Sequence, residues 1–156
     1  MAAATARNRE LSFFNTHTGE TLTSLYCCDE RYQPGALAKI NHILRDHRAN
    51  EVKEIDVHLL DLLHRLGGTL QVSKPYHVIS GYRSPSTNAR LRTQGGAHTG
   101  VASRSLHMVG KAIDIRIPDV PLNELRRVAV ALKGGGVGYY PDLNFVHVDV
   151  GRVRYW

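Results

Sequence analysis

Several features of other protein classes are missing from this 156-residue sequence. No run approaches the ~18 uninterrupted apolar residues of a membrane-spanning helix, which excludes an integral helical membrane protein. The only cysteines, Cys27 and Cys28, are adjacent, and neighbouring cysteines pair only through a strained ring. We therefore expect no disulfide framework, and without a third sulfur no cysteine-rich zinc site. No apolar stretch follows Met1, so we also expect no signal peptide in this chain.

Positive charge exceeds negative charge, since 20 Lys and Arg face 14 Asp and Glu, giving a formal net charge of +6. A basic protein of this size favours an anionic partner such as nucleic acid, a membrane surface or an acidic cell-wall polymer. The basic residues are scattered and form no run typical of nucleic-acid patches, so we expect no nucleic-acid partner. The 42% hydrophobic and 22% charged residues are ordinary for a folded domain.

The chain shows no internal repeat and no low-complexity segment. We expect residues 1–10 to be a disordered N-terminal segment and residues 11–156 to form a single domain. Residues 11–33 alternate irregularly around Gly19, which predicts a short hairpin.

Two helices are expected in the first half. An apolar stripe that begins after Pro34 predicts a helix ending near Asn50. A second helix is expected over Val57–Leu66, with Asp56 as its N-cap and Gly67-Gly68 as its stop. The leucines of this second helix share one face and should lie in the core.

The second half is richer in strands. Strands are predicted at Tyr76–Ser80, Lys111–Ile117, Val137–Tyr140 and Phe145–Val150, and a helix at Leu122–Leu132. Residues 86–106 predict a long surface loop with a short helix around Thr87–Leu91, and loops of that length usually carry function. This order predicts an α+β fold with helices packed on one face of a small, mainly antiparallel sheet.

Strand alternation places reactive side chains on one face of this sheet. In Lys111–Ile117 the isoleucines alternate with Asp114, and in Phe145–Val150 the valines alternate with His147 and Asp149. The isoleucine and valine faces belong against the helices. The open face then presents two carboxylates and an imidazole, which favours a divalent metal.

His107 supplies a third candidate ligand, seven residues before Asp114. Gly110 would allow a tight turn between these two positions. Two histidines and one carboxylate leave a fourth tetrahedral position open, as catalytic zinc requires. The helical H-E-x-x-H signature of many zinc peptidases is absent. A lone His or Asp on a strand is usually structural, so alternation alone supports this site only weakly.

A set of motifs is similar to a known family. The motifs are Ser105-x-His107-x-x-Gly110-x-Ala112-x-Asp114, Gly135–Tyr140, Phe145–Asp149 and Ser80–Ser84. They resemble the D-Ala-D-Ala carboxypeptidase-type zinc peptidases of the LAS group, which also includes lysostaphin-type enzymes and the hedgehog signalling domain. Phe14–Glu20 and Arg45–Arg48 look like the murein endopeptidase K subgroup. The resemblance covers nearly the whole chain, from about residue 10 to residue 156.

The resemblance implies a hedgehog/D-Ala-D-Ala peptidase-like fold with one Zn²⁺ per chain on the open face of the sheet. His107, Asp114 and His147 would be the metal ligands. In such enzymes zinc polarises the scissile carbonyl and acidifies its bound water.

The resemblance also implies substrate-binding residues. Arg83 would hold an anionic peptide carboxylate or the developing oxyanion, because its planar fork suits a carboxylate. Its structural alternative is an ordinary ion pair. Tyr82, in the same motif, is expected to contact substrate. Ser105 would bind substrate or orient a ligand, with a turn-stabilising hydroxyl as its alternative.

The general base is left open. Many relatives carry an acid three residues before the last histidine ligand, or a histidine two before it, but these positions are Asn144 and Phe145 here. Asp149 is the favoured candidate, either as the base or as a carboxylate that orients a zinc-bound histidine. An ion pair with Arg116 is the alternative for Asp149. The other candidate bases are Asp142 and His98.

The favoured function is that of a zinc-dependent peptidoglycan endopeptidase. The resemblance suggests an L,D-type enzyme that cuts diaminopimelate–diaminopimelate cross-links, with D-Ala–diaminopimelate links as a second target. The alternatives are a D,D- or L,D-carboxypeptidase that trims stem peptides, and a non-catalytic zinc-containing wall-binding module. Peptidoglycan stem peptides and cross-links would be the partners of a monomer located in the periplasm or elsewhere in the cell envelope.

Overall fold

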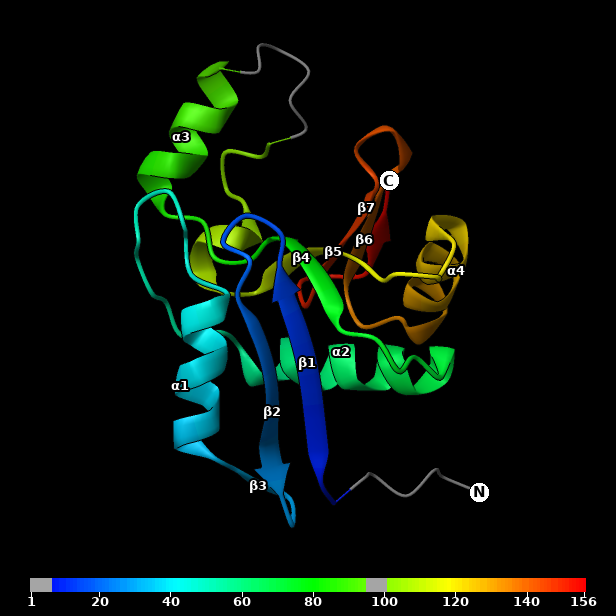
Figure 1. The fold of residues 1–156 in the computed structure, drawn as a ribbon. Coiled ribbons are helices and arrows are strands. Elements are labelled where there is room, and N and C mark those ends of the chain that lie inside the picture. The colour runs from blue at the N-terminus through cyan, green and yellow to red at the C-terminus, as the bar shows by residue number, and fades with distance from the viewer. Residues whose placement is uncertain (1–6, 95–100) are drawn as a thin grey trace.

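One mixed sheet organises the parts of the chain that the structure describes, residues 7–94 and 101–156 of a computed structural model (Figure 1). The sheet has eight strands in the order β3-β2-β1-β4-β5-β7-β6-β8. The strands are β1 (Arg9–Asn15), β2 (Thr21–Cys28), β3 (Arg31–Tyr32), β4 (Tyr76–Ser80), β5 (Ala112–Arg116), β6 (Gly136–Tyr140), β7 (Phe145–Asp149) and β8 (Arg154–Tyr155). The helices are α1 (Pro34–Ile43), α2 (Val57–Leu70), α3 (Pro85–Gln94) and α4 (Leu122–Leu132), with the short 3₁₀ helices η2 (Leu106–Val109) and η3 (Pro141–Leu143).

Neighbouring strands are antiparallel except for two pairs, β1 with β4 and β6 with β8. The predicted α+β class with a mainly antiparallel sheet is confirmed. The turn at Gly19, where φ is 77°, joins β1 and β2 as the expected hairpin.

The hydrophobic core lies between the sheet and helices α1, α2 and α4. The predicted core leucines of α2 have no exposed surface: Leu59, Leu60, Leu63 and Leu66. Ile113 and Ile115 of β5 pair with valines of β7 and are equally buried, as alternation predicts. Burying each such side chain contributes about 1.5–3 kcal/mol, so this packing fixes which face of β5 and β7 remains open.

Helix α1 ends at Ile43, so the prediction of a helix reaching Asn50 is wrong. The buried carboxylate of Asp46 accepts hydrogen bonds from the backbone N–H groups of Arg48 and Ala49, at 2.9 and 3.2 Å. A side chain that satisfies the backbone in this way competes with helical hydrogen bonds. The chain therefore leaves the helix before this turn.

Helix α2 begins as predicted, because the side chain of Asp56 accepts from the N–H of His58 and forms the N-cap. The predicted stop at Gly67-Gly68 is wrong, since the helix continues to Leu70. A side chain at Gly67 would press against the hydroxyl of Tyr76, 3.1 Å away. This glycine therefore serves close packing inside the helix.

The ends of two other predicted segments also differ. Strand β1 begins at Arg9, within the segment expected to be disordered, because the Arg9 guanidinium lies 2.6 Å from the carboxylate of Asp61 on α2. Helix α3 extends on both sides of the predicted Thr87–Leu91. It lies apart from the sheet, at the top of Figure 1. His98 and residues 1–6 lie outside the described residues.

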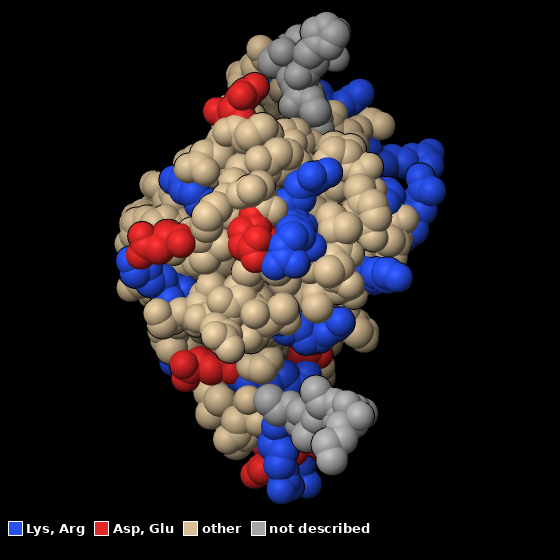
Figure 2. All heavy atoms as spheres, turned by 90° about the vertical axis from the view of Figure 1, so that its right-hand side faces the viewer, with Lys and Arg blue, Asp and Glu red and all other residues tan. Residues whose placement is uncertain are grey.

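None of the described helices combines the length and the apolar composition required to traverse a bilayer. Figure 2 shows lysine and arginine side chains spread over one face of the molecule, between acidic and uncharged residues. The positive charge of this face is therefore dispersed rather than gathered in one stripe.

Candidate active site

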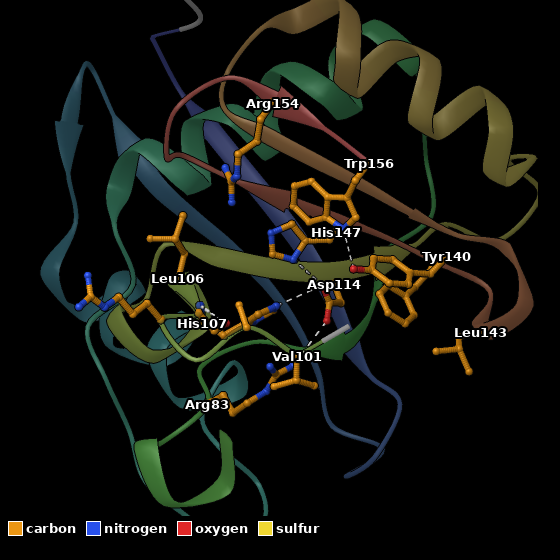
Figure 3. Close-up of a pocket in the computed structure, with 14 residues that line it drawn as sticks. Arg83, Val101, Leu106, His107, Asp114, Tyr140, Leu143, His147, Arg154 and Trp156 are labelled. Carbon is orange, nitrogen blue, oxygen red and sulfur yellow. Dashed lines mark hydrogen bonds and ion pairs between the residues drawn. The ribbon is translucent and has the colours of Figure 1, made fainter. Parts of the chain in front are cut away.

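Three predicted ligands meet on the open face of the sheet (Figure 3). Asp114 on β5 lies directly opposite His147 on β7, and η2 brings in His107. All three side chains are buried, and one ligand atom from each lies within 4.8 Å of the others. The structure therefore assembles a His-Asp-His group that could hold a metal ion.

Local hydrogen bonds fix the ring of His107. Ser105 caps η2 by accepting from the backbone N–H of His107, and Gly110 ends η2 with φ at 70°. A Cβ at Gly110 would lie 2.3 Å from the carbonyl oxygen of Glu54, so glycine is required by space as well as by φ. The His107 Nδ1 donates to the carbonyl oxygen of Gly81 at 2.8 Å. Its Nε2 is left facing the Asp114 carboxylate at 3.2 Å.

The ring of His147 is oriented the opposite way. Its Nδ1 lies 3.0 Å from Oδ1 of Asp114, and its Nε2 donates to Oδ2 of Asp149 at 2.7 Å. Each histidine thus directs one nitrogen to the centre and donates from the other to a protein oxygen. That arrangement is usual for histidines that bind metals.

Asp149 has no exposed surface, and its carboxylate is surrounded by donors. The guanidinium of Arg154 donates to both carboxylate oxygens, at 3.0 and 2.8 Å. The backbone N–H groups of Gly136 and Gly151 donate to Oδ1 at 2.9 Å. The expected alternative partner of Asp149, Arg116, instead donates to the carbonyl oxygen of Asn144.

The electrostatics of the group favour a cation. Burial alone would raise the pKa of Asp114, but His107 and His147 hold it well below its usual range. Burial opposes the charge of His147 as well, yet Asp114 and Asp149 raise the pKa of His147 to about 9. An imidazole that holds its proton so tightly lies in a strongly negative environment. A divalent ion would compete with that proton for the same nitrogen, so these residues fit a metal.

Arg83 reaches the same pocket from the turn after β4. Its Nη2 lies 3.8 Å from Oδ2 of Asp114, and its guanidinium also donates to Asn88 and Ser80. Its buried Nε has no hydrogen-bond partner among the residues that the structure describes. Burial lowers the pKa of Arg83, an effect that Asp114 opposes. The site therefore holds a buried cation with a spare donor.

The other predicted site residues are placed differently. Ser105 lines the pocket and caps η2. Tyr82 packs in the hydrophobic core and is not among the described residues that line the pocket. Asp142 is exposed on η3 and does not line the pocket either.

Several lining residues were not predicted as site residues, among them Tyr140, Arg154 and Trp156. Arg154 belongs to β8, and Trp156 follows this strand directly. Both side chains pass over glycines of β6 toward residues of β7. A Cβ at Gly136 would lie 2.3 Å from Arg154, and one at Gly138 would lie 2.6 Å from Trp156. Glycines at alternate positions of a strand indicate that something approaches closely. That signal is present in the sequence.

Comparisons with known proteins address the family of this chain. The profile of the family described as peptidoglycan L,D-endopeptidase MepK matches residues 3–156. The chain belongs to this family.

Two relatives from the MepK family illustrate how far the similarity extends. Peptidoglycan L,D-endopeptidase MepK of Escherichia coli (strain K12) is 45% identical over 153 residues, which cover 98% of this chain and 82% of the relative. Probable peptidoglycan L,D-endopeptidase MepK of Haemophilus influenzae is 42% identical over 154 residues, covering 98% and 81%. The family expected from the sequence motifs is thereby confirmed, and the MepK family is one of peptidoglycan-hydrolysing peptidases.

Proposed function

We propose that this chain is a zinc-dependent peptidoglycan endopeptidase that hydrolyses peptide cross-links, with L,D-type diaminopimelate–diaminopimelate bonds as its target. The observation that carries the proposal is the buried His107–Asp114–His147 group in a chain of the MepK family. Peptidoglycan lies in the cell envelope, so the chain would act there or in the periplasm. One chain supplies the whole group, which is consistent with a monomer.

One Zn²⁺ per chain would be held by His107 through Nε2, by His147 through Nδ1 and by the Asp114 carboxylate. Two nitrogens and one carboxylate match catalytic zinc sites, which keep a further position open. The ion would supply Lewis-acid polarisation of the scissile carbonyl and a more acidic water.

Asp149 would act as a positioning residue. Its carboxylate holds the Nε2 proton of His147 and is itself held by Arg154. These contacts support orientation of the ligand, the second of the two roles considered for Asp149, because the buried carboxylate already accepts from two side chains and two backbone N–H groups.

Arg83 would bind an anionic carboxylate of the stem peptide. Its guanidinium lies beside Asp114 and lines the pocket, where its planar fork can pair with a carboxylate. Ser105 lines the same pocket as Arg83 and would contribute a hydroxyl to substrate binding. Its oxygen accepts from the backbone N–H of His107, and its proton can be donated to substrate.

Digestion of purified cross-linked muropeptides tests the proposal, with the products identified by mass. With zinc present we expect dimers to become monomers, and we expect His107→Ala to abolish the reaction. His58→Ala is the matched control, since that histidine is 81% exposed on α2. Metal content is measured in each variant.

Each alternative predicts a different product. Loss of one D-Ala without conversion of dimers would indicate a carboxypeptidase. Tight muropeptide binding without turnover across several metals would indicate a wall-binding module. Product formation that persists in His107→Ala would reject the proposed site.

A further inference from the structure

One hydroxyl in the pocket is not used by the proposed mechanism. Apart from the three candidate ligands, the ionisable side chains among the described lining residues are three arginines and Tyr140. Arginines remain protonated and serve as cations. Among these ionisable side chains, Tyr140 is therefore the one that offers a hydroxyl as a hydrogen-bond donor.

The ring of Tyr140 is fixed from two sides. It stacks on Phe145, its cross-strand neighbour on β7, with centroids 4.7 Å apart and planes 21° apart. Its hydroxyl oxygen accepts a hydrogen bond from Nε1 of Trp156 at 2.6 Å. An indole N–H can only donate, so the hydroxyl must be the acceptor and keeps its own proton for another partner. In Figure 3 the hydroxyl points toward Asp114 and His147.

Trp156 is itself held in place. Its backbone N–H donates to Val137 at 3.1 Å, and its carbonyl accepts from Tyr139 at 2.9 Å, which extends the parallel pairing of β8 with β6. The indole lies over Gly138 and beside the ring of His147, with centroids 5.1 Å apart. The indole N–H is therefore positioned by the strand and not by the pocket contents.

We propose that Tyr140 is a catalytic residue, whose hydroxyl donates a hydrogen bond to the scissile carbonyl oxygen as that oxygen gains negative charge. Trp156 is the positioning residue that orients this hydroxyl. The proposal rests on the proposed peptidase function. It gives Tyr140 a role distinct from that of Arg83, which would bind the substrate carboxylate. A donor fixed before the reaction stabilises developing charge without the cost of reorganisation.

Steady-state kinetics of Tyr140→Phe on cross-linked muropeptide dimers test the proposal. The change removes the hydroxyl and keeps the ring that stacks on Phe145. We expect kcat to fall about 100-fold, the usual effect of removing one such donor, while KM and metal content stay near wild type. Tyr139→Phe is the matched control, because Tyr139 lies on the other face of β6 against Arg126 and should keep full activity.

The positioning role has its own readout. Trp156 is the single tryptophan of the sequence, so its fluorescence reports the pair directly. We expect Tyr140→Phe to shift the emission maximum, because the indole N–H loses its acceptor, whereas Tyr139→Phe leaves it unchanged. Trp156→Phe removes the N–H and should lower kcat by a smaller factor than Tyr140→Phe, with KM little changed.

The outcomes separate this proposal from the proposed function. If the wild type cleaves dimers and Tyr140→Phe cleaves them equally fast, the role of Tyr140 is overturned and the peptidase assignment stands. If Tyr140→Phe raises KM and leaves kcat unchanged, the hydroxyl binds substrate and this proposal is overturned. If the wild type with zinc cleaves no dimer, both are overturned.

Discussion

The site has two walls that are built in different ways. The strand wall consists of Asp114, His147 and Asp149 on β5 and β7, covered by Arg154 and Trp156. The loop wall consists of Arg83, Ser105 and His107, which lie on turns and on η2.

A regular sheet register places the residues of the strand wall. The loop wall depends on single contacts with distant segments. The backbone N–H of Tyr82 donates to the Leu44 carbonyl at 2.7 Å, and that of Ser84 donates to the Asp46 carboxylate at 2.9 Å. We therefore expect the two walls to differ in their tolerance to substitution, because many backbone hydrogen bonds of the sheet hold the strand wall and a few single contacts hold the loop wall.

The largest effect should come from removing a ligand, whichever wall carries it. Asp114→Asn keeps the shape of the side chain but replaces the carboxylate with a weaker ligand. We expect loss of bound metal and a fall in kcat of at least about 1,000-fold, as for His107→Ala in the loop wall. Metal analysis and muropeptide digestion measure this. A variant that retains one metal per chain would show that the substituted residue is not a required ligand.

The next effect tests the support behind the strand wall. Asp149→Asn should weaken metal binding about 10- to 100-fold, because the hydrogen bond that orients His147 loses its charged acceptor. Competition with a chelator measures the affinity, and Arg154→Met should follow in the same direction. Unchanged metal affinity with turnover lost at saturating metal would instead identify Asp149 as the base.

The support behind the loop wall should affect folding more than metal binding. Asp46 is 2% exposed, and Asp46→Ala leaves the N–H groups of Ser84, Arg48 and Ala49 without their acceptor. We expect the free energy of unfolding to fall by about 2–3 kcal/mol, measured with urea at fixed metal concentration. An unchanged midpoint would show that the loops have other support.

The same carboxylate gives the loop wall a pH dependence. Burial would raise the pKa of Asp46, but hydrogen bonds from Ser84, Thr87 and Ala49 lower it to about 2 from an ordinary value of 3.8. A lowered pKa stabilises the folded state above the unfolded value, and this stabilisation is lost as the pH falls through the folded value. The stability difference between wild type and Asp46→Ala should therefore be constant above about pH 5 and shrink as the pH falls toward pH 2.

The smallest effect is expected at the rim. Asp142→Asn changes an exposed carboxylate on η3 that does not line the pocket, so kcat and metal affinity should match the wild type. A large loss of kcat in this variant would show that Asp142 serves as the base and that η3 moves toward the site.

The strand wall was largely predictable from the sequence. Alternation placed Asp114, His147 and Asp149 on one face because the opposite face of each strand is uniformly apolar. The turn at Gly110 also indicated how His107 could return toward β5. The ion pair with Arg116, considered as the alternative for Asp149, is not formed, and Arg154 holds this carboxylate instead. The sequence did not reveal Arg154, since a two-residue strand such as β8 has no pattern that shows its pairing with β6.

The loop wall was less predictable. The link from Asp46 to Ser84 spans 38 residues, and no periodicity connects the two positions. The same carboxylate ended α1 early, although the apolar stripe continued beyond Ile43. Tyr82 illustrates the same limit, because a motif places neighbouring residues together without showing that one faces the pocket and the other the core.

The position of Trp156 has a practical consequence for anyone handling this protein. Trp156 lines the pocket and is 47% exposed, whereas β1 begins at the opposite end of the molecule (Figure 1). A purification tag or fusion partner joined after Trp156 would therefore start beside the candidate active site, and an acidic one would lie beside Arg154. Fusions placed ahead of β1 would keep the pocket clear.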